Sequence, residues 1–315
     1  MTFSYDNNQE ELVTMSSINL LNINIFQKID SFIRILMNHP ATPEWVADNL
    51  NQLYLPFCLA YDDEYDYSES VRAFLGSTKA IVGEFLPNKV NWNKQLACQF
   101  LMMLHAYRDR VMTSIALQRS QEMDNQYELI KYVNQLLNHY SRLLFVRVDL
   151  SYLVDNLANV KLDDFYEHIT KLRELISNKQ TCFEHLQGYA WALEQGIDKS
   201  LHCHLLLIYD GAKRQKDVFI GREVGEKWLY ITGNNGNYYN CNNPDYKSFY
   251  QQRQLLGIGM IHRDNPLEIE NAIRVARYLV EPEKVNQHLT IRLPNMRTFG
   301  KGQFNVSWRR GINHL

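Results

Sequence analysis

The chain has 315 residues, of which 45% are hydrophobic and 22% charged, and its formal net charge is −2. This balance is typical of a globular protein and excludes disordered and fibrous classes. No apolar stretch is long enough to span a membrane, the first residues lack a secretory signal, and five cysteines occur without CxxC pairing. We therefore expect a cytoplasmic protein with reduced thiols, and no membrane partner.

The first 140 residues have the pattern of a helical accessory domain. Apolar residues recur at spacings of three and four over residues 25–36 and again over 97–107, which predicts two helices. A third helix is expected from about Asn125 to Tyr140. The acidic stretch 61–67 is expected to be a solvated loop or the start of a helix. Nothing in residues 1–140 carries recognisable chemistry.

Strands and helices alternate from about Arg142 onward. Dense apolar segments predict strands over 143–150, 188–195 and 201–208, and helical spacing predicts helices over 162–177 and 217–228. The Gly/Asn-rich stretch 233–244 reads as a loop. A last helix begins at Pro266, with Asn265 as its N-cap, and ends near Val280 before Pro282. This order predicts an α+β domain on an antiparallel sheet over residues 141–315.

Two histidines, His202 and His204, lie inside the apolar strand 201–208. Side chains alternate between the faces of a strand, so both imidazoles share one face and Cys203 points to the other. Buried imidazoles need polar partners, and two of them about 7 Å apart along a strand can bind one metal ion. Histidines that are separately satisfied, or merely exposed, explain the pattern equally well.

The register of the hairpin decides whether Glu194 joins this pair. A three-residue loop at 197–199 places Glu194 opposite His202 on the same face, whereas an even loop places it on the other face. Two imidazoles and a carboxylate suit Mg²⁺ or Mn²⁺, while the orientation of Cys203 disfavours a structural zinc site. The alternative is a surface carboxylate at the hairpin edge. Asp149, ending the first strand, could support the metal or cap the next turn.

Tyr278 stands apart from the core stripe of the last helix. That stripe comprises Ile269, Ala272, Ile273, Ala276 and Val280, and Tyr278 points roughly 180° away from it. The tyrosine is therefore exposed, packed under another element, or functional. Arg274 and Arg277 precede it and could hold a phosphate near its hydroxyl, and Lys284 follows the helix.

In this order the motifs resemble the YagK/YfjJ C-terminal domain family. That family is found in inovirus-like phages and prophage islands, and it is allied to rolling-circle replication initiators, the HUH (His-hydrophobic-His) endonucleases. The resemblance covers about residues 142–302 and rests on the segments 145–150, 188–194, 202–207 with 210–211, 225–228, 257–261, 277–279 and 297–300. It implies an antiparallel-sheet, HUH endonuclease-like domain preceded by an all-α domain.

The resemblance also implies roles for individual residues. His202 and His204 would bind a divalent metal, Mg²⁺ or Mn²⁺, with Glu194 as the third ligand. Tyr278 would be the catalytic nucleophile, leaving a 5′-phosphotyrosine link and a free 3′-hydroxyl. The superfamily usually has a lysine three residues after the tyrosine, where this chain has Glu281; Lys284 could substitute as a catalytic residue.

The C-terminal half is the more basic one. Residues 1–141 carry 10 Lys and Arg against 16 Asp and Glu, whereas residues 142–315 carry 23 against 19. We expect phosphate contacts from seven basic side chains, although each alone could be solubilising surface charge: Arg274, Arg277, Arg292, Arg297, Lys301, Arg309 and Arg310. The expected partner is single-stranded DNA or an origin hairpin, with a host replication helicase or polymerase as a further partner.

Three functional hypotheses remain open from the sequence. The leading one is a metal-dependent enzyme that nicks and joins single-stranded DNA and initiates rolling-circle replication of a phage or mobile element. A DNA-binding prophage regulator on the same fold, with a degenerate nuclease site, is the alternative that Glu281 favours. A scaffold or interaction protein is favoured only by the acidic helical half.

Overall fold

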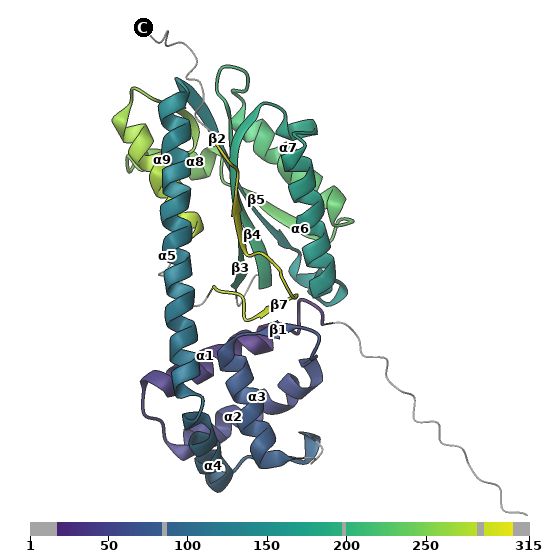
Figure 1. Cartoon of the computed structure of the whole chain (residues 1–315). Coiled ribbons are helices and arrows are strands. Elements are labelled where there is room, and N and C mark those ends of the chain that lie inside the picture. The colour runs from purple at the N-terminus through teal and green to yellow at the C-terminus, as the bar shows by residue number, and fades with distance from the viewer. Residues whose placement is uncertain (1–17, 84–86, 197–199, 282–286, 305–315) are drawn as a thin grey trace, which may run out of the picture.

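One long helix joins a group of N-terminal helices to a sheet with helices on both faces (Figure 1). The computed structural model describes residues 18–83, 87–196, 200–281 and 287–304. This arrangement confirms the expected helical N-terminal region followed by an antiparallel sheet. Whether the two form separate domains divided at residues 140 and 141 stays a prediction. Within the described residues, no helix is both long and apolar enough to cross a membrane.

The N-terminal region packs four helices around a core of aromatic rings. They are α1 (Asn24–Asn38), α2 (Pro43–Ala60), α3 (Glu69–Val82) and α4 (Lys94–His105). Their buried rings include Phe26, Phe57, Phe74 and Phe100. The predicted helices over 25–36 and 97–107 are confirmed as α1 and α4. The sequence pattern did not predict α2 and α3, and in α2 apolar residues such as the exposed Leu59 lie outside the buried face and blur the stripe.

The acidic stretch 61–67 is a loop, but the expectation that it is solvated is wrong for several of its residues. Asp62, Tyr65 and Tyr67 are buried, and Asp66–Tyr67 forms β1, which pairs with β7 (Ile291–Arg292). The ring of Tyr67 packs against Phe26, and its hydroxyl donates a hydrogen bond to the Asp62 carbonyl. The tyrosines between the acidic residues therefore decide the burial of this loop.

Helix α5 (Arg108–His139) spans both regions (Figure 1). The sequence predicted its start only near Asn125, and that boundary is wrong. Val111 packs into the N-terminal core, and residues from Leu129 onward pack over the sheet. Between these two residues the helix, which is described throughout, buries no side chain. A helix that bridges two regions through solvent has no apolar stripe there, so its first half left no periodic signal.

The sheet is antiparallel throughout, in the order β5-β2-β4-β3-β8, with β6 also paired to β2. The three predicted strands are confirmed as β2 (Arg142–Tyr152), β3 (Leu186–Gly196) and β4 (Ser200–Asp210). The remaining strands are short: β5 (Gly236–Asn240), β6 (Gly259–His262) and β8 (Phe299–Lys301). Short 3₁₀ turns cover Pro87–Lys89, Val154–Asn159 and Thr181–Phe183.

The prediction that residues 233–244 form a loop is wrong, because β5 lies within them. Asn and Gly are depleted in strands, so propensity argued against one here. Pairing with β2 overrides that propensity, and Tyr238 packs closely over Gly225. Helix α8 (Pro244–Gln251) follows directly, capped by the side chain of Asn243.

Each face of the sheet is covered by two helices. The predicted helices α6 (Leu162–Ser177) and α7 (Asp217–Ile231) cover one face, where Val148, Leu205 and Leu207 are buried. The second half of α5 and α9 (Pro266–Leu279) cover the opposite face, over Phe145 and Leu206. The Asn265 cap of α9 is confirmed, since its side chain accepts a hydrogen bond from the Glu268 N–H.

The hairpin between β3 and β4 is tied to the N-terminal region through Gln195. The side-chain oxygen of Gln195 accepts two hydrogen bonds of 2.9 Å from Thr290, and its side-chain nitrogen donates to the Ile23 carbonyl at 3.1 Å. Gln27 donates to the main-chain oxygen of Gln195, and the Ser200 hydroxyl donates to the Leu20 carbonyl. These bonds fix the end of the hairpin that carries the predicted site.

Candidate metal centre

The hairpin register brings Glu194 onto the face of the two histidines. Glu194 lies opposite His202 and Gly196 opposite Ser200, as the three-residue loop predicted; the loop itself, 197–199, lies outside the described residues. Glu194, His202 and His204 are each 7% exposed. Cys203 points into the core beneath α6 and α7, away from them, as expected. One strand pair therefore presents two imidazoles and a carboxylate side by side.

These three side chains converge on one point. The Oε2 atom of Glu194 lies 3.1 Å from His204 Nε2 and 3.5 Å from His202 Nε2. One ligand atom from each residue lies within 4.8 Å of the others. Two nitrogens and a carboxylate oxygen so close together are stable only with a proton or cation among them, which is the arrangement of a divalent-metal site. The residues thus fit the predicted ion.

Hydrogen bonds on the far side of each ring fix which nitrogen faces this point. His204 Nδ1 lies 2.8 Å from Asp149 Oδ1, and His202 Nδ1 lies 3.2 Å from the carbonyl oxygen of Ser200. Both partners are acceptors, so each Nδ1 carries a proton, and Nε2 is the nitrogen that faces Glu194 and can bind a metal once it is deprotonated. Metal-ligating histidines are typically oriented in this way. Of the two roles considered for Asp149, the structure favours support of the site.

Arg147 belongs to the same cluster, and the sequence reasoning missed it. It is 5% exposed, and its guanidinium makes hydrogen bonds of 3.1 and 3.2 Å to the two carboxylate oxygens of Asp149. It also lies 3.3 Å from His204 Nδ1 and stacks 5.0 Å from the ring centroid of Tyr278. The available signal was an arginine inside an apolar strand, two residues from Asp149 and therefore on its face.

The contacts within the cluster shift the pKa values of Asp149 and His204. Burial raises the pKa of Asp149, but hydrogen bonds and charge from His204 and Arg147 more than offset this, so the pKa lies well below its usual value. Burial lowers the pKa of His204, yet hydrogen bonds with Asp149 and Glu194 outweigh it and leave the pKa raised. In the absence of a metal, His204 is therefore favoured to carry a second proton, whose positive charge offsets the carboxylates of Asp149 and Glu194.

Tyr278 lies beside the histidines. Its ring centroid is 6.5 Å from that of His204, and the side chain is 44% exposed. Tyr278 is outside the hydrophobic core, as expected, but the prediction that it lies opposite the buried side of α9 is wrong. Asn271, seven residues earlier and therefore on the same side of the helix, is buried, so Tyr278 lies at the edge of the buried face. Helix α9 can approach the segment before β6 closely because Gly257 has no Cβ; a Cβ there would overlap the backbone oxygen of Asn271.

The electrostatic surroundings of Tyr278 keep its phenol protonated. Burial raises the pKa of Tyr278, the Arg147 guanidinium opposes that rise, and the carboxylates of Glu194, Asp149 and Glu281 add to it. Glu281, at the position where the resemblance implied a lysine, therefore acts against ionisation of the phenol. Lys284, considered as its substitute, lies outside the described residues.

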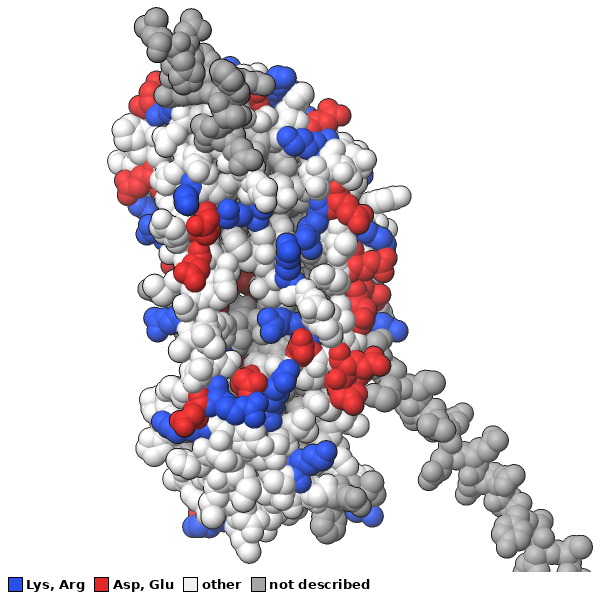
Figure 2. Space-filling model, viewed as in Figure 1, with Lys and Arg blue, Asp and Glu red and all other residues white. Residues whose placement is uncertain are grey.

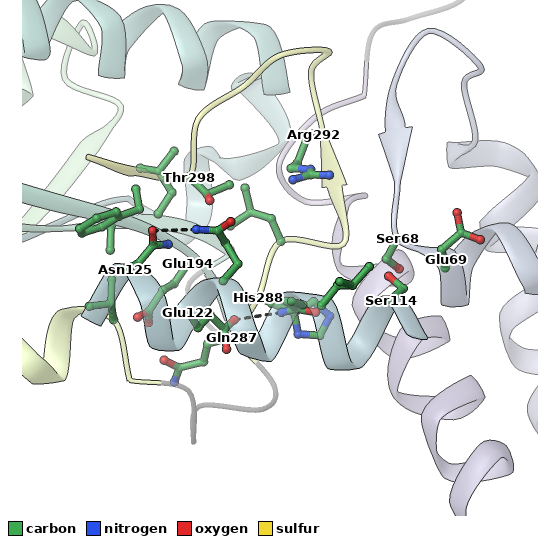
Figure 3. Close-up of a pocket in the computed structure, with 18 of the residues that line it drawn as sticks. Ser68, Glu69, Ser114, Glu122, Asn125, Glu194, Gln287, His288, Arg292 and Thr298 are labelled. Carbon is green, nitrogen blue, oxygen red and sulfur yellow. Dashed lines mark hydrogen bonds between the residues drawn. The ribbon is translucent and has the colours of Figure 1, made fainter. Parts of the chain in front are cut away.

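A cavity of about 820 Å³ opens beside Glu194 (Figure 3). Its walls come from the first half of α5, the end of β3, the end of α9 with the residues just after it, residues 287–299 and the start of α3. Among the described residues its charged lining is mainly acidic, with two arginines: Glu69, Asp109, Glu122, Glu194, Glu281, Arg110 and Arg292. Such a lining favours cations over polyanions.

The described members of the predicted set of phosphate contacts lie on several different elements. Arg274 and Arg277 are exposed on α9, Arg292 lies on β7 at the cavity, and Lys301 on β8 stacks over Tyr132. Arg297 is exposed between the last two, and Arg309 and Arg310 lie outside the described residues. Acidic and basic side chains are interspersed on the face in Figure 2.

Comparison with known proteins gives one family match. The family model described as the YagK/YfjJ C-terminal domain matches residues 108–288, which is more than half of the chain. The match begins with α5, earlier than the motifs alone suggested, and covers α9 and the whole cluster around His204. No significant match was found among curated proteins or solved structures.

Proposed function

The chain belongs to the YagK/YfjJ C-terminal domain family, and we propose that it nicks and rejoins single-stranded DNA through Tyr278, assisted by a divalent metal. The observation that carries the proposal is the half-exposed phenol of Tyr278 next to the buried Glu194, His202 and His204. On this proposal the sheet is of the HUH endonuclease type. The protein would act in the cytoplasm, initiating rolling-circle replication of a phage or mobile element with host helicase or polymerase.

The chemistry is a transesterification at phosphorus. Held by Glu194, His202 and His204, a divalent ion such as Mg²⁺ or Mn²⁺ would withdraw charge from the scissile phosphate. The phenol oxygen of Tyr278 bonds to phosphorus as the bond to the 3′-oxygen breaks, and the proton lost by the phenol balances the one gained by the 3′-hydroxyl. The phosphotyrosine ester keeps the strand available for rejoining.

Arg147 is the described residue best placed to assist the phenol. The guanidinium lies against the ring of Tyr278 and lowers the pKa of its hydroxyl, as the missing lysine would. Arg147 also holds Asp149, which in turn orients His204. In this proposal Arg147 offsets the effect of Glu281, and Lys284 remains a second candidate for that role.

Adduct formation tests the proposal. We expect the protein to form a denaturant-resistant complex with single-stranded DNA in Mn²⁺ or Mg²⁺, and none in chelator. An oligonucleotide labelled at its 3′ end should carry its label into the complex, because the tyrosine joins the 5′ phosphate of the downstream fragment. A 5′-labelled oligonucleotide of the same sequence should instead release a shortened free strand. Cleavage that leaves no protein on either fragment would contradict the tyrosine mechanism.

A regulator with a degenerate site is the second candidate, and Glu281 is the observation that favours it. Its carboxylate raises the pKa of Tyr278, the reverse of what a nucleophile needs. Such a protein would bind DNA in the same assay without cutting it. Replacing Glu281 with lysine should then create adduct formation, whereas in an active enzyme the same change should only accelerate it.

Metal affinity is expected to fall as the pH drops, beginning above the ordinary histidine pKa of about 6.5. The pKa of His204 is raised, and its Nε2 must lose a proton before it can bind metal, so protons compete with the ion. Because the pKa of His204 is raised in the folded state, its protonation also stabilises the metal-free protein. This contribution is fully present below the pKa of histidine in the unfolded chain and is lost as the pH rises through the folded-state pKa. Mn²⁺ calorimetry in two buffers of different ionisation enthalpy should detect the released proton; pH-independent affinity would contradict the assignment.

A further inference from the structure

A row of aromatic rings continues from the metal centre across the sheet. Tyr239 on β5 lies opposite Asp149 on β2, and Asp149 lies opposite His204 on β4, so all three side chains share one face. The ring of Tyr246 on α8 lies 6.2 Å from that of Tyr239. Tyr250 and Phe249 extend the row, with centroid separations of 4.5 and 5.2 Å between successive rings. The first ring, Tyr239, is therefore on the strand next to Asp149, the residue that orients His204.

The first and last rings of this row are open to solvent. Tyr239 is 48% and Phe249 49% exposed, and the Arg253 guanidinium lies 3.6 Å above the ring of Phe249. In the described part of the chain, none of the four rings belongs to either hydrophobic core. Exposed aromatic faces with an arginine above them are a common means of holding unpaired bases.

Arg147 connects this row to Tyr278. Its guanidinium lies against the Tyr278 ring, and its charge also opposes the rise that burial causes in the pKa of Tyr246. One buried cation is therefore near both the proposed nucleophile and the inner part of the row. A phosphate at the metal centre and a base on the row would lie on adjacent parts of one surface.

The charged residues differ between the two sides of the metal centre, and this difference favours one path for a bound DNA strand. The cavity beyond Glu194 is mainly acidic among its described lining residues, which disfavours a polyanion there. On the other side Arg253 lies at the end of the aromatic row, over the ring of Phe249. A bound strand would then leave the metal centre past Arg147 and Asp149 rather than through the cavity.

We propose that Tyr239, Tyr246, Tyr250 and Phe249 form a stacking surface for successive bases of single-stranded DNA adjacent to the scissile phosphate. The proposal rests on the proposed function and adds where the bases of the substrate bind. Stacking tolerates any base, so this surface contributes affinity and positions the strand without selecting its sequence.

Removing an aromatic ring from the protein and removing the bases from the DNA strand should weaken binding in the same way. The probe is a fluorescent oligothymidylate of about 15 nucleotides, compared with an abasic strand of equal length, in chelator so that nothing is cut. The native protein should bind the thymidylate about 5- to 100-fold more tightly than the abasic strand. In Tyr239→Leu and Phe249→Leu that preference should shrink, while affinity for the abasic strand stays constant. Tyr239→Phe, which keeps the ring, should restore it.

Tyr230→Leu provides the matched control, because Tyr230 is 80% exposed on α7, at the opposite face of the sheet. Three results would each overturn the stacking surface. They are an equal loss of the preference for thymidylate in Tyr230→Leu, an unchanged preference in both Tyr239→Leu and Phe249→Leu, and no preference in the native protein. The Mn²⁺ adduct assay on the native protein is read separately. Adduct without a base preference would refute only the stacking surface, and a base preference without adduct would refute only the nicking activity.

Discussion

Tyr278→Phe should reduce covalent adduct formation by about a thousandfold or more, because the variant lacks the oxygen that would bond to phosphorus. The ring, and with it the contacts to His204 and Arg147, is retained. Stability should change by about 0.5 kcal/mol or less, since the side chain is half-exposed. Binding of uncut DNA and of Mn²⁺ should stay close to native values. The measurement is the rate of 3′-label transfer to the protein.

Tyr230→Phe is the control for this change, as it removes a hydroxyl from an exposed tyrosine on the far face. It should form adduct at the native rate. Adduct formation that persists in Tyr278→Phe would assign the nucleophile to another residue, and mapping the labelled peptide would identify it. Strand cleavage that persists without adduct would instead indicate water as the attacking group.

Replacing both histidines should remove the metal centre. We expect His202→Ala/His204→Ala to bind Mn²⁺ about a hundredfold more weakly or worse, because only Glu194 of the three donors remains. Excess Mn²⁺ should raise the free energy of unfolding of the native protein by about 2.7 kcal/mol at a hundred times the Kd, and should not stabilise the variant. Calorimetry and thermal unfolding with added metal measure the two effects.

Cys203→Ala is the matched control because Cys203 lies between the two histidines on the same strand but faces the opposite core. It should lower stability slightly and leave Mn²⁺ affinity unchanged. Since the double alanine variant removes the imidazole that bonds to both Asp149 and Glu194, His202→Asn/His204→Asn provides a second version that keeps polar groups in place. Native Mn²⁺ affinity in either folded variant would disprove the site.

The parts of the site that local rules govern were predictable from the sequence. Alternation along a strand placed His202 and His204 on one face, and the short loop fixed the register that adds Glu194. Helical phase placed Tyr278 outside the hydrophobic core, although it lies at the edge of the buried face of α9 and not opposite it. Its position above His204 depends on how α9 packs on the sheet, which phase alone does not determine; the family resemblance supplied that expectation.

Other parts depend on contacts between distant segments. Arg147 could have been an isolated charge, and only the pairing of β2 with β4 shows that it joins Asp149 and His204. β5 forms in an Asn- and Gly-rich segment because β2 offers it a pairing edge. The first half of α5 has no apolar stripe, since it passes between regions and not over a core. Local sequence patterns could not predict these three features, because each depends on contacts between segments that are far apart in the chain or on the absence of a core beneath the helix.

The bonds that hold the hairpin have a consequence for how this family can vary. Ser200 and Gln195 donate to the carbonyl oxygens of Leu20 and Ile23, atoms that the main chain offers whatever side chain is present. Substitutions at these two positions would therefore leave the acceptors in place as long as the backbone keeps its path. Homologues could diverge widely before α5, where the family match begins, and still hold Glu194 in register with His202. Sequence drift in the N-terminal region is thus compatible with an unchanged metal centre.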